Sequence, residues 1–316
     1  MFLNKSYIPL TFEDSLIHKT IIKKFKDYSN NSLDIIFYGN NGTGKYILSQ
    51  LFLESIFGLN IYKKKKYNDM PNYLYSNYHY EIYLSRTYDK SVFKKFILDL
   101  CINKNIVTNL NNIILIKNAH YLENDIILFM KTLIEQQNPV SFILISNTIS
   151  HLPDSFKNLF FKERVPTLNK KELFDLINSI CEKENIDMTF NKKEELISIT
   201  EHNISKIMLN IQFYKKTQRF LTYTNNQIDA ILNLVYEKKN ENILKIREKI
   251  YDLTSKNINK DFLIKYALKK VLSKIDCDTK KMSLIKEVAH IDQNLKHSYK
   301  DLIHIEYFFI LLMKYI

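Results

Sequence analysis

The chain has 316 residues, and its 46 Lys and Arg against 34 Asp and Glu give a formal net charge of +12. Hydrophobic residues make up 46%, and only 4 Gly and 5 Pro are present, which excludes collagen-like and Gly/Pro-rich disordered classes. A chain of this length predicts about two or three domains with a substantial core. The charge favours a polyanionic partner such as nucleic acid, and it fits equally well the lysine-rich coding of an A/T-rich genome.

The cysteines Cys101, Cys181 and Cys277 lie far apart and form no CxxC pair. This spacing argues against a disulfide framework or a zinc site and predicts a reducing compartment. The N-terminal residues lack the charged-then-apolar layout of a signal peptide, and the apolar run 307–313 is too short to cross a bilayer. We therefore expect no membrane association.

The first clear structural signal is the short apolar run 33–38, which predicts a buried strand. A glycine-rich turn follows and leads into an apolar-periodic helix predicted over 47–57. Strand, glycine-rich turn and helix form the setting of a phosphate-binding loop. The residues that match GxxxxGK, with the residue after it, are Gly39, Asn40, Asn41, Gly42, Thr43, Gly44, Lys45 and Tyr46.

Beyond this helix, the lysine run Lys63–Lys66 predicts an exposed loop or an irregular hairpin. Strand and helix patterns then alternate as far as Pro166, which predicts βαβ units and a mainly parallel sheet. The predicted strands and helices of this part are strands at 79–84, 112–116 and 141–146 and helices at 90–101 and 123–136.

After Pro166 only helical patterns remain. We predict an α/β P-loop domain at 1–166, a small helical domain at 167–224, called the lid domain below, and an all-α domain at 225–316, called the collar domain below. The predicted helices are 170–184, 192–200 and 205–218 in the lid and 228–237, 241–253, 261–274 and 299–314 in the collar. The last of these is apolar around much of its circumference, which favours either a core helix of this domain or a helix that also packs against another chain.

The chemistry of the loop is that of phosphate binding. Glycines let backbone N–H groups close around phosphate oxygens, the helix N-terminus adds partial positive charge, and Lys45 neutralises the outer phosphates. The residue after the lysine is normally Ser or Thr, whose hydroxyl holds Mg²⁺, and here it is Tyr46. We therefore expect bound ATP or ADP but weakened Mg²⁺ binding.

The strand that normally ends in the catalytic carboxylates supports the same prediction. Here the run at 113–116 leads into Lys117-Asn118-Ala119-His120, which contains no carboxylate to hold Mg²⁺ or to orient water. His120 is interpreted as a polar loop residue rather than a catalytic base. The sequence predicts no catalytic residue and no metal site, and so a protein that does not hydrolyse nucleotide.

Several short segments match one known family. They are KSYIP at 5–9, FYGNNGTGKY at 37–46, NYHYEI at 77–82, ISNT at 145–148 with Asn147 as the sensor asparagine, RVP at 164–166 and IREKIYDL at 246–253. Together they resemble an AAA+ clamp-loader subunit, specifically a small subunit of replication factor C, over nearly the whole chain. The similarity is nearest to the subunit at the last position of the pentameric arc, called subunit 3 or 5.

The resemblance implies a role in DNA replication and repair. The implied partners are the other replication factor C subunits of a hetero-pentamer, the sliding clamp PCNA, and primer–template DNA held through phosphate contacts. It implies a nuclear location, or a cytoplasmic replication site if the protein is viral. KSYIP corresponds to the family's adenine-side element, with Ile8 in place of its arginine.

Other family features are altered. The arginine finger position falls at Leu159, with Lys157 as the nearest cation, and the sensor-2 arginine position falls at Ser205, beside Lys206. The combined losses favour a subunit with an architectural role.

Two other functions fit the same residues. One is a stand-alone P-loop ATPase or kinase that holds a metal through Asp125 or Glu123. The other is a DNA-binding or checkpoint protein that uses the AAA+ fold as a scaffold. The lysines of 63–66 and Lys94-Lys95 are interpreted mainly as solvated, and the abundant Tyr and Phe as core residues rather than base-stacking platforms.

Overall fold

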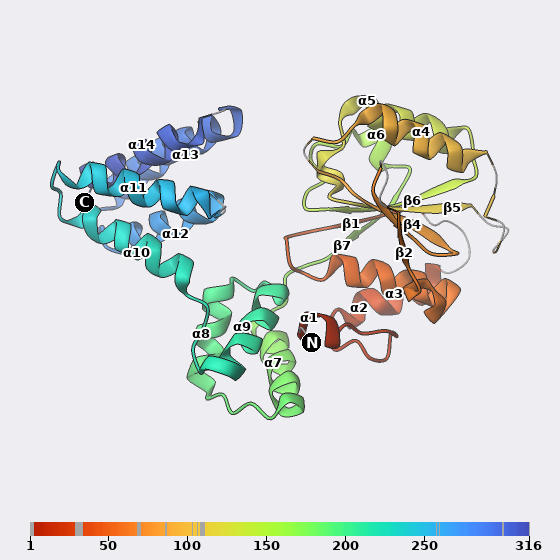
Figure 1. Ribbon diagram of the computed structural model, residues 1–316, viewed down its shortest axis with the longest axis horizontal. Coiled ribbons are helices and arrows are strands. Elements are labelled where there is room, and N and C mark those ends of the chain that lie inside the picture. The colour runs from red at the N-terminus through yellow and green to blue at the C-terminus, as the bar shows by residue number, and fades with distance from the viewer. Residues whose placement is uncertain are drawn as a thin grey trace. The chain divides into compact units, whose positions relative to one another are not determined.

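The computed structural model describes residues 3–28, 34–67, 71–85, 87–102, 104–105, 107, 111–256, 258, 260–298 and 300–315. The chain divides into two compact units, residues 1–220 and residues 221–316 (Figure 1). The first unit contains a sheet with flanking helices and three further helices, and the second unit is helical.

The sheet of the first unit has the strand order β2-β3-β4-β5-β6-β1-β7. The five strands from β4 to β7 in this order pair in parallel, whereas β2 and β3 form an antiparallel extension beside β4. The strands are β1 (Ile35–Tyr38), β2 (Lys65–Tyr67), β3 (Tyr73–Tyr75), β4 (His79–Tyr83), β5 (Asn112–Lys117), β6 (Val140–Ser146) and β7 (Phe161–Arg164).

The central strands are apolar because helices cover both faces of the sheet. Alternate residues point to opposite faces, so Ile113 and Leu115 of β5 join one apolar cluster and Ile114 and Ile116 join the other. One face packs on α2 (Lys19–Tyr28) and α3 (Lys45–Phe57), and the opposite face on α4 (Lys90–Cys101), α5 (Asn124–Glu135) and α6 (Asp154–Lys157), as Figure 1 shows.

Three helices follow the sheet in the first unit: α7 (Lys170–Glu184), α8 (Phe190–Thr200) and α9 (Ile204–Thr217). A capping box begins α7, in which Asn169 accepts from the N–H of Glu172 and the Glu172 carboxylate accepts from the N–H of Asn169. The helices share one apolar cluster with Leu3 of α1 (Leu3–Ser6). This cluster fastens the N-terminal segment to the three helices.

The second unit packs its helices around an apolar cluster of its own. Its C-terminal helix is central to that cluster because Ile305, Phe308, Phe309, Leu311 and Leu312 are all buried. The helices are α10 (Tyr223–Tyr236), α11 (Asn242–Ser255), α12 (Lys260–Leu272), α13 (Asp278–His297) and α14 (Asp301–Tyr315).

The fold class predicted from the sequence is confirmed, and the predicted elements agree with the structure to within a few residues. The elements that the sequence analysis did not predict include α1, α2, α6, β7 and α13. Only Glu163 of β7 is buried, where it pairs with Lys24 of α2 at 3.0 Å, so β7 carries no apolar run. The division at 1–166, 167–224 and 225–316 stays a prediction.

Two smaller predictions concern the lysine run and membranes. The run 63–66 leads into the β2–β3 hairpin; Lys63, Lys65 and Lys66 are exposed, but Lys64 turns inward. Within the described part of the chain, no helix combines the length and apolarity needed to cross a membrane.

A pH-dependent stability is expected from Asp34, directly before β1. Its Oδ1 accepts from the backbone N–H of Phe142 at 2.6 Å, and burial raises the pKa of this carboxyl from 3.8 to about 6. Because the folded-state pKa exceeds the unfolded one, stability is fully present below about pH 4 and is lost as the pH rises through about 6. We expect Asp34→Asn to raise the free energy of unfolding by about 1–2 kcal/mol at neutral pH, and by little at pH 4.

Urea denaturation at the two pH values measures this effect. Asp99→Asn, on the exposed side of α4, serves as the matched control and should show no such change. An equal effect of Asp34→Asn at both pH values would contradict the assignment.

Candidate functional site

The glycine-rich loop lies between the carboxyl end of β1 and the first turn of α3. Gly42 and Gly44 have φ values of 76° and 92°, in the left-handed region that glycine tolerates. A Cβ on Gly39 would lie 2.2 Å from the carbonyl oxygen of Val165, so backbone packing also requires glycine there. The loop therefore has the conformation that the sequence predicts for a phosphate cradle.

The Lys45 side chain folds back onto the loop that precedes it. Its Nζ donates to the carbonyl oxygens of Gly39 at 2.7 Å and Asn40 at 2.6 Å, and to Oδ1 of Asn147 at 3.2 Å. Burial lowers the pKa of Lys45 to about 8. The structure thus brings together the predicted loop lysine and the predicted sensor asparagine, which come from β1–α3 and from the end of β6.

Helix α9 closes against the loop. The N–H of Ile204, its first residue, donates to the Gly42 carbonyl oxygen at 3.0 Å, and Nδ2 of Asn203 donates to the Asn41 oxygen at 3.4 Å. Asn203 also caps α9 by accepting from the N–H of Lys206. A Cβ on Gly42 would lie 2.1 Å from Oδ1 of Asn203. The helical part of this unit is therefore in direct contact with the phosphate loop.

The N-terminal segment holds the other side of the loop. His18 Nε2 lies 2.8 Å from the carbonyl oxygen of Thr43, and burial lowers the pKa of His18. The neutral ring can donate to that oxygen through an Nε2–H tautomer. Thr43 in turn donates its hydroxyl to the Asn40 oxygen at 3.0 Å, so the loop is tied to the segment before α2 as well as to itself.

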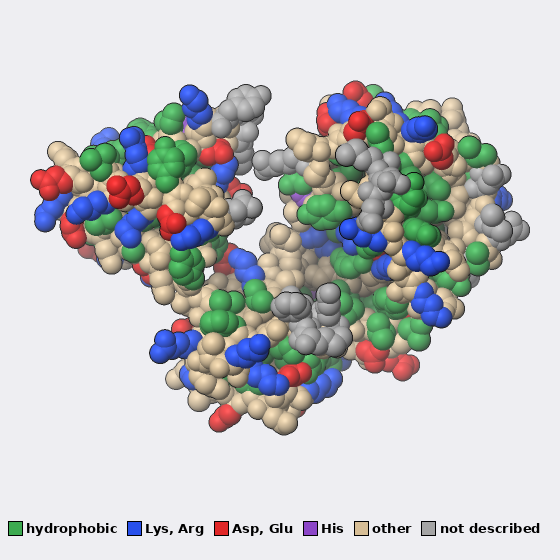
Figure 2. Space-filling model, viewed as in Figure 1, with side chains coloured by type: hydrophobic (Ala, Val, Ile, Leu, Met, Phe, Trp, Pro, Cys, Tyr) green, Lys and Arg blue, Asp and Glu red, His purple; other side chains and the backbone are tan. Residues whose placement is uncertain are grey.

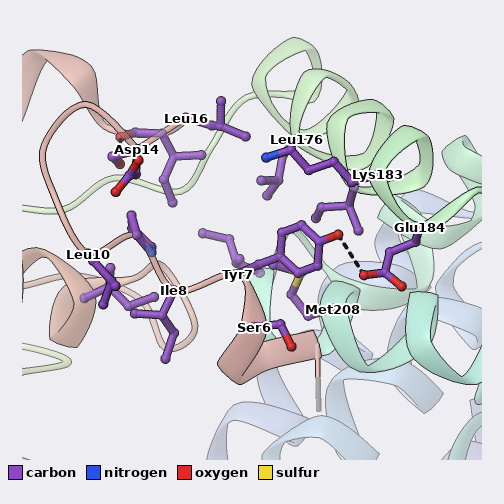
Figure 3. A pocket seen from close by; sticks show the side chains of 16 residues that line it. Ser6, Tyr7, Ile8, Leu10, Asp14, Leu16, Leu176, Lys183, Glu184 and Met208 are labelled. Atoms are coloured by element: carbon purple, nitrogen blue, oxygen red, sulfur yellow. Dashed lines mark hydrogen bonds between the residues drawn. The ribbon is translucent and has the colours of Figure 1, made fainter. Parts of the chain in front are cut away.

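A cavity of about 500 Å³ opens next to the loop (Figure 3). The N-terminal segment forms one wall, with Ile8, Leu10 and Leu16, and helices α7 and α9 form the other, with Leu176 and Met208. Ile204, which donates to the loop, also lines this cavity. An apolar cavity next to a phosphate cradle is the arrangement expected for a nucleotide base.

Tyr7 is the largest polar group of this cavity. Its hydroxyl donates to Oε1 of Glu184 at 2.8 Å, and Lys183 Nζ lies 5.8 Å from the centre of its ring. Burial, with the hydrogen bond to Glu184, raises the pKa of Tyr7 to about 12. Figure 3 shows the ring lying across the cavity toward α7. The KSYIP segment is therefore placed beside the cavity.

The Tyr46 side chain points into a polar cluster. Its hydroxyl donates to the carboxylate of Glu81, at 3.0 Å from Oε2. Lys117 Nζ lies 3.0 Å from the same Oε2 and 3.5 Å from the centre of the Tyr46 ring. Lys64 Nζ lies 2.5 Å from Oε1 of Glu81 and also contacts Gln50 of α3. We call Tyr46, Gln50, Lys64, His79, Glu81 and Lys117 the Glu81 cluster.

The electrostatics of the cluster centre on one buried carboxylate, since Glu81 is 3% exposed. Burial alone would raise its pKa, but the hydrogen bond from His79 and the charges of Lys117 and Lys64 outweigh burial and hold the pKa far below its usual range. Burial lowers the pKa of His79, so its neutral ring donates Nε2–H to Glu81 and accepts at Nδ1 from the Ser76 hydroxyl.

These contacts decide whether a divalent metal fits. The two positions that would supply its ligands carry Tyr46 and Lys117, whose phenol and ammonium both bind Glu81. An ammonium is a cation and offers no lone pair, and Mg²⁺ requires oxygen ligands. The described residues contain no group of three or more His, Cys, Asp and Glu side chains that could hold a metal ion. The residues present do not fit Mg²⁺ at this place.

The remaining predicted positions lie elsewhere in the first unit. Leu159 packs against the apolar cluster beneath α4 and α5, and Lys157 pairs with Asp154 at 2.7 Å. Ser205 and Lys206 are exposed in the first turn of α9. Glu123 and Asp125, the alternative metal ligands, lie 2.5 and 3.8 Å from Lys90 Nζ.

Sequence reasoning did not identify His18, Asn203 or the Glu81 cluster. One signal was present: His79 and Glu81 alternate along a predicted buried strand, and Lys117 ends the next one. Because the two strands are parallel neighbours, Glu81 and Lys117 lie on the same face of the sheet, close enough to contact each other. His18 and Asn203 gave no such signal, because they approach the loop from distant segments.

The sequence as a whole matches no known family model. It is similar to a protein of Acanthamoeba polyphaga mimivirus that is named as a replication factor C small subunit. The two are 24% identical over 330 residues, which cover 98% of this chain and 89% of that protein. A Walker-type ATPase of Pyrococcus abyssi superposes with a TM-score of 0.47 and 14% identity, over 71% of this chain and 75% of that one.

The parallel sheet, the glycine-rich loop before α3 and the helical lid against that loop define a P-loop domain of the AAA+ class. The full-length similarity then confirms the resemblance predicted from the short motifs. Over 98% of its length the chain is similar, at 24% identity, to a protein that is named as a replication factor C small subunit.

The contact between Gly42 and Asn203 makes a quantitative prediction. Gly42→Ala places a methyl group against Asn203 at positive φ and should destabilise the protein by about 1–3 kcal/mol. Asn203→Ala removes the cap of α9 and should cost about 1 kcal/mol. In the double variant the clash is relieved, so the combined loss should be smaller than the sum.

Chemical denaturation of the four proteins measures this coupling. Asp89→Ala, which removes the cap of α4, is the matched control and should be additive with Gly42→Ala. Additivity of Gly42→Ala with Asn203→Ala would show that α9 does not close on the loop.

Proposed function

We propose that the chain is a non-hydrolysing, nucleotide-binding subunit of a replication factor C-like clamp loader. Such a complex opens the ring-shaped sliding clamp and places it on primer–template DNA, while related subunits supply ATP hydrolysis. The observation that carries the proposal is the similarity to a protein named as a replication factor C small subunit over 98% of the chain.

The geometry supports ATP or ADP as the ligand. The phosphates would lie against the backbone N–H groups of the loop, with Lys45 and the N-terminus of α3 as the positive charges. The base would enter the apolar cavity between the N-terminal segment and α7 and α9. Because Ile204 contacts both parts, one ligand can fill cavity and loop together.

The same geometry supports the absence of hydrolysis. Phosphoryl transfer from ATP needs a held metal ion and a group that orients the attacking water. In this chain Lys117 occupies the end of β5, and Tyr46 is directed into the Glu81 cluster. Leu159 packs into the apolar core, so it offers no cation to a neighbouring subunit.

The second unit supports assembly with other subunits. Ile303, Tyr307 and Ile310 of α14 are 57%, 53% and 40% exposed, at a spacing that places them on one helix face. Leu244 and Tyr251 of α11 are 65% and 53% exposed. The bidentate pair of Arg247 with Glu306, at 2.8 and 2.9 Å, joins the two helices between these residues. An apolar stripe of this kind fits a subunit contact.

The DNA part of the proposal rests on charge. Figure 2 shows that Lys and Arg side chains on the visible face are interspersed with Asp and Glu over both units. Lysine contacts to phosphates need no sequence reading, so a dispersed positive charge suits primer–template DNA enclosed by a complex. We propose a location at the site of replication, in the nucleus of a cell or at a cytoplasmic site of a virus.

The purified chain should bind nucleotide with almost no turnover. We expect less than about one ATP hydrolysed per minute, far below the usual range of enzymes, and no further fall in Lys45→Ala. A phosphate-release assay measures the rate, and fluorescent ADP measures binding, which Lys45→Ala should abolish. Turnover of several per minute that depends on Lys45 would support the stand-alone ATPase instead.

Assembly is tested by affinity purification of the tagged chain from its native cells. We expect four related AAA+ chains in near-equal amount. Ile303→Glu with Tyr307→Glu should remove them without a change in the melting temperature, because both side chains are more than half exposed. Met282→Glu on α13, which is 72% exposed, is the matched control and should leave the complex intact. Recovery of the chain alone would contradict the clamp-loader role.

A further inference from the structure

The Glu81 cluster joins four separate parts of the first unit and includes the residue that directly follows the loop lysine. Tyr46 and Gln50 come from α3, His79 and Glu81 from β4, and Lys117 from the end of β5, while Lys64 enters from the residue before β2. Tyr46 directly follows the loop lysine, so the cluster adjoins the first turn of α3. Two of its members, Tyr46 and Lys117, stand at the sequence positions that would supply the ligands of a metal.

The charges of the cluster do not cancel. The Glu81 carboxylate supplies one negative charge, the ammonium groups of Lys64 and Lys117 supply two positive charges, and the His79 ring is neutral. With both lysines protonated the sum is one surplus positive charge, although burial lowers the pKa of Lys64, and it lies in the cluster that includes Tyr46, the residue directly after Lys45. This surplus is held in place, because the Lys64 and Lys117 side chains are only 14% and 22% exposed.

We propose that Lys117, held by Glu81 and Tyr46, is a built-in cation that makes nucleotide binding at this P-loop independent of divalent metal ions. The inference rests on the proposed nucleotide-binding function and specifies its ligand as the metal-free nucleoside di- or triphosphate. The surplus charge attracts the polyphosphate, whose negative charge is highest without a metal.

The same surplus charge disfavours a divalent cation. A metal bound to the phosphates would approach the Lys117 ammonium and find no carboxylate ligand, since the described carboxylate at this place, Glu81, is already paired. The Tyr46 ring adds to the fixation of Lys117 because the ammonium lies 3.5 Å from its centre, within cation–π range. Tyr46 therefore helps to hold the Lys117 ammonium in place.

The first experiment is a calorimetric titration of the full chain with ADP and with ATPγS, once with excess Mg²⁺ and once with EDTA. The dissociation constants should differ by less than about threefold, which corresponds to about 0.6 kcal/mol. Binding that requires Mg²⁺ would overturn the inference and leave the proposed function standing. Absence of binding in both buffers, by a folded protein, would overturn both.

The second experiment replaces the built-in cation. In Lys117→Met, Glu81 keeps its contacts with Lys64 and His79, so the protein should fold with a similar melting temperature. We expect ADP to bind about tenfold more weakly in EDTA, with part of the loss restored by Mg²⁺. Lys95→Met, an exposed lysine of α4, is the matched control and should change neither value.

A Lys117→Met protein that binds as tightly as the wild type in EDTA would overturn the inference. So would a loss that Mg²⁺ does not restore, because a purely structural role of Lys117 would weaken binding equally in both buffers. The double variant Tyr46→Ser/Lys117→Asp supplies the missing hydroxyl and carboxylate and should convert ADP binding to Mg²⁺ dependence. Its failure to show that dependence while folded would also count against the proposal.

Discussion

A single buried carboxylate organises the part of the molecule that matters most for its chemistry. Glu81 receives hydrogen bonds or ion pairs from Tyr46, Gln50, Lys64, His79 and Lys117, and these come from α3, the hairpin approach, β4 and β5. An isolated charge at this depth would be costly, whereas a carboxylate with this many donors is compensated. Removing one of these donors would leave the buried Glu81 carboxylate less well compensated. The position of the first turn of α3, and with it the phosphate loop, therefore depends on this network.

The phosphate loop is built mainly by backbone contacts. Gly39 packs on Val165, Gly42 accepts from Ile204, and Thr43 accepts from His18. These contacts come from the residue after β7, from α9 and from the N-terminal segment. The position of the loop therefore depends on all three of these parts of the first unit. A ligand that changes the loop conformation would act on α9 directly, through the hydrogen bonds of Ile204 to Gly42 and of Asn203 to Asn41. The helix α9 is therefore in direct hydrogen-bond contact with the loop that would hold the phosphates.

Much of this architecture follows from local pattern. The buried strands and the loop lysine are visible because apolar runs, glycines and a lysine at fixed spacing have few other interpretations. β7 was missed because it is polar and forms through pairing with β1, and α13 because its buried residues, Leu284, Val288 and Ile291, are sparse. Lys64 was interpreted as solvated with its neighbours. Nothing in a run of lysines reveals which one turns inward, since the partner, Glu81, lies on another strand.

In this geometry, nucleotide binding and nucleotide hydrolysis would depend on different residues. Binding of a polyphosphate depends on backbone N–H groups, a helix N-terminus and Lys45. The presence of Tyr46 and Lys117 is compatible with all three. Hydrolysis depends on a few side chains that hold the metal and orient water. At the corresponding positions this chain has the Lys117 ammonium and the Tyr46 phenol, which contact each other. In the proposed function, a chain built this way would respond to a nucleotide through the lid helices and leave hydrolysis to a neighbouring subunit. The Glu81 cluster then serves as a fixed counterpart of a metal, with a charge that does not leave when the nucleotide does.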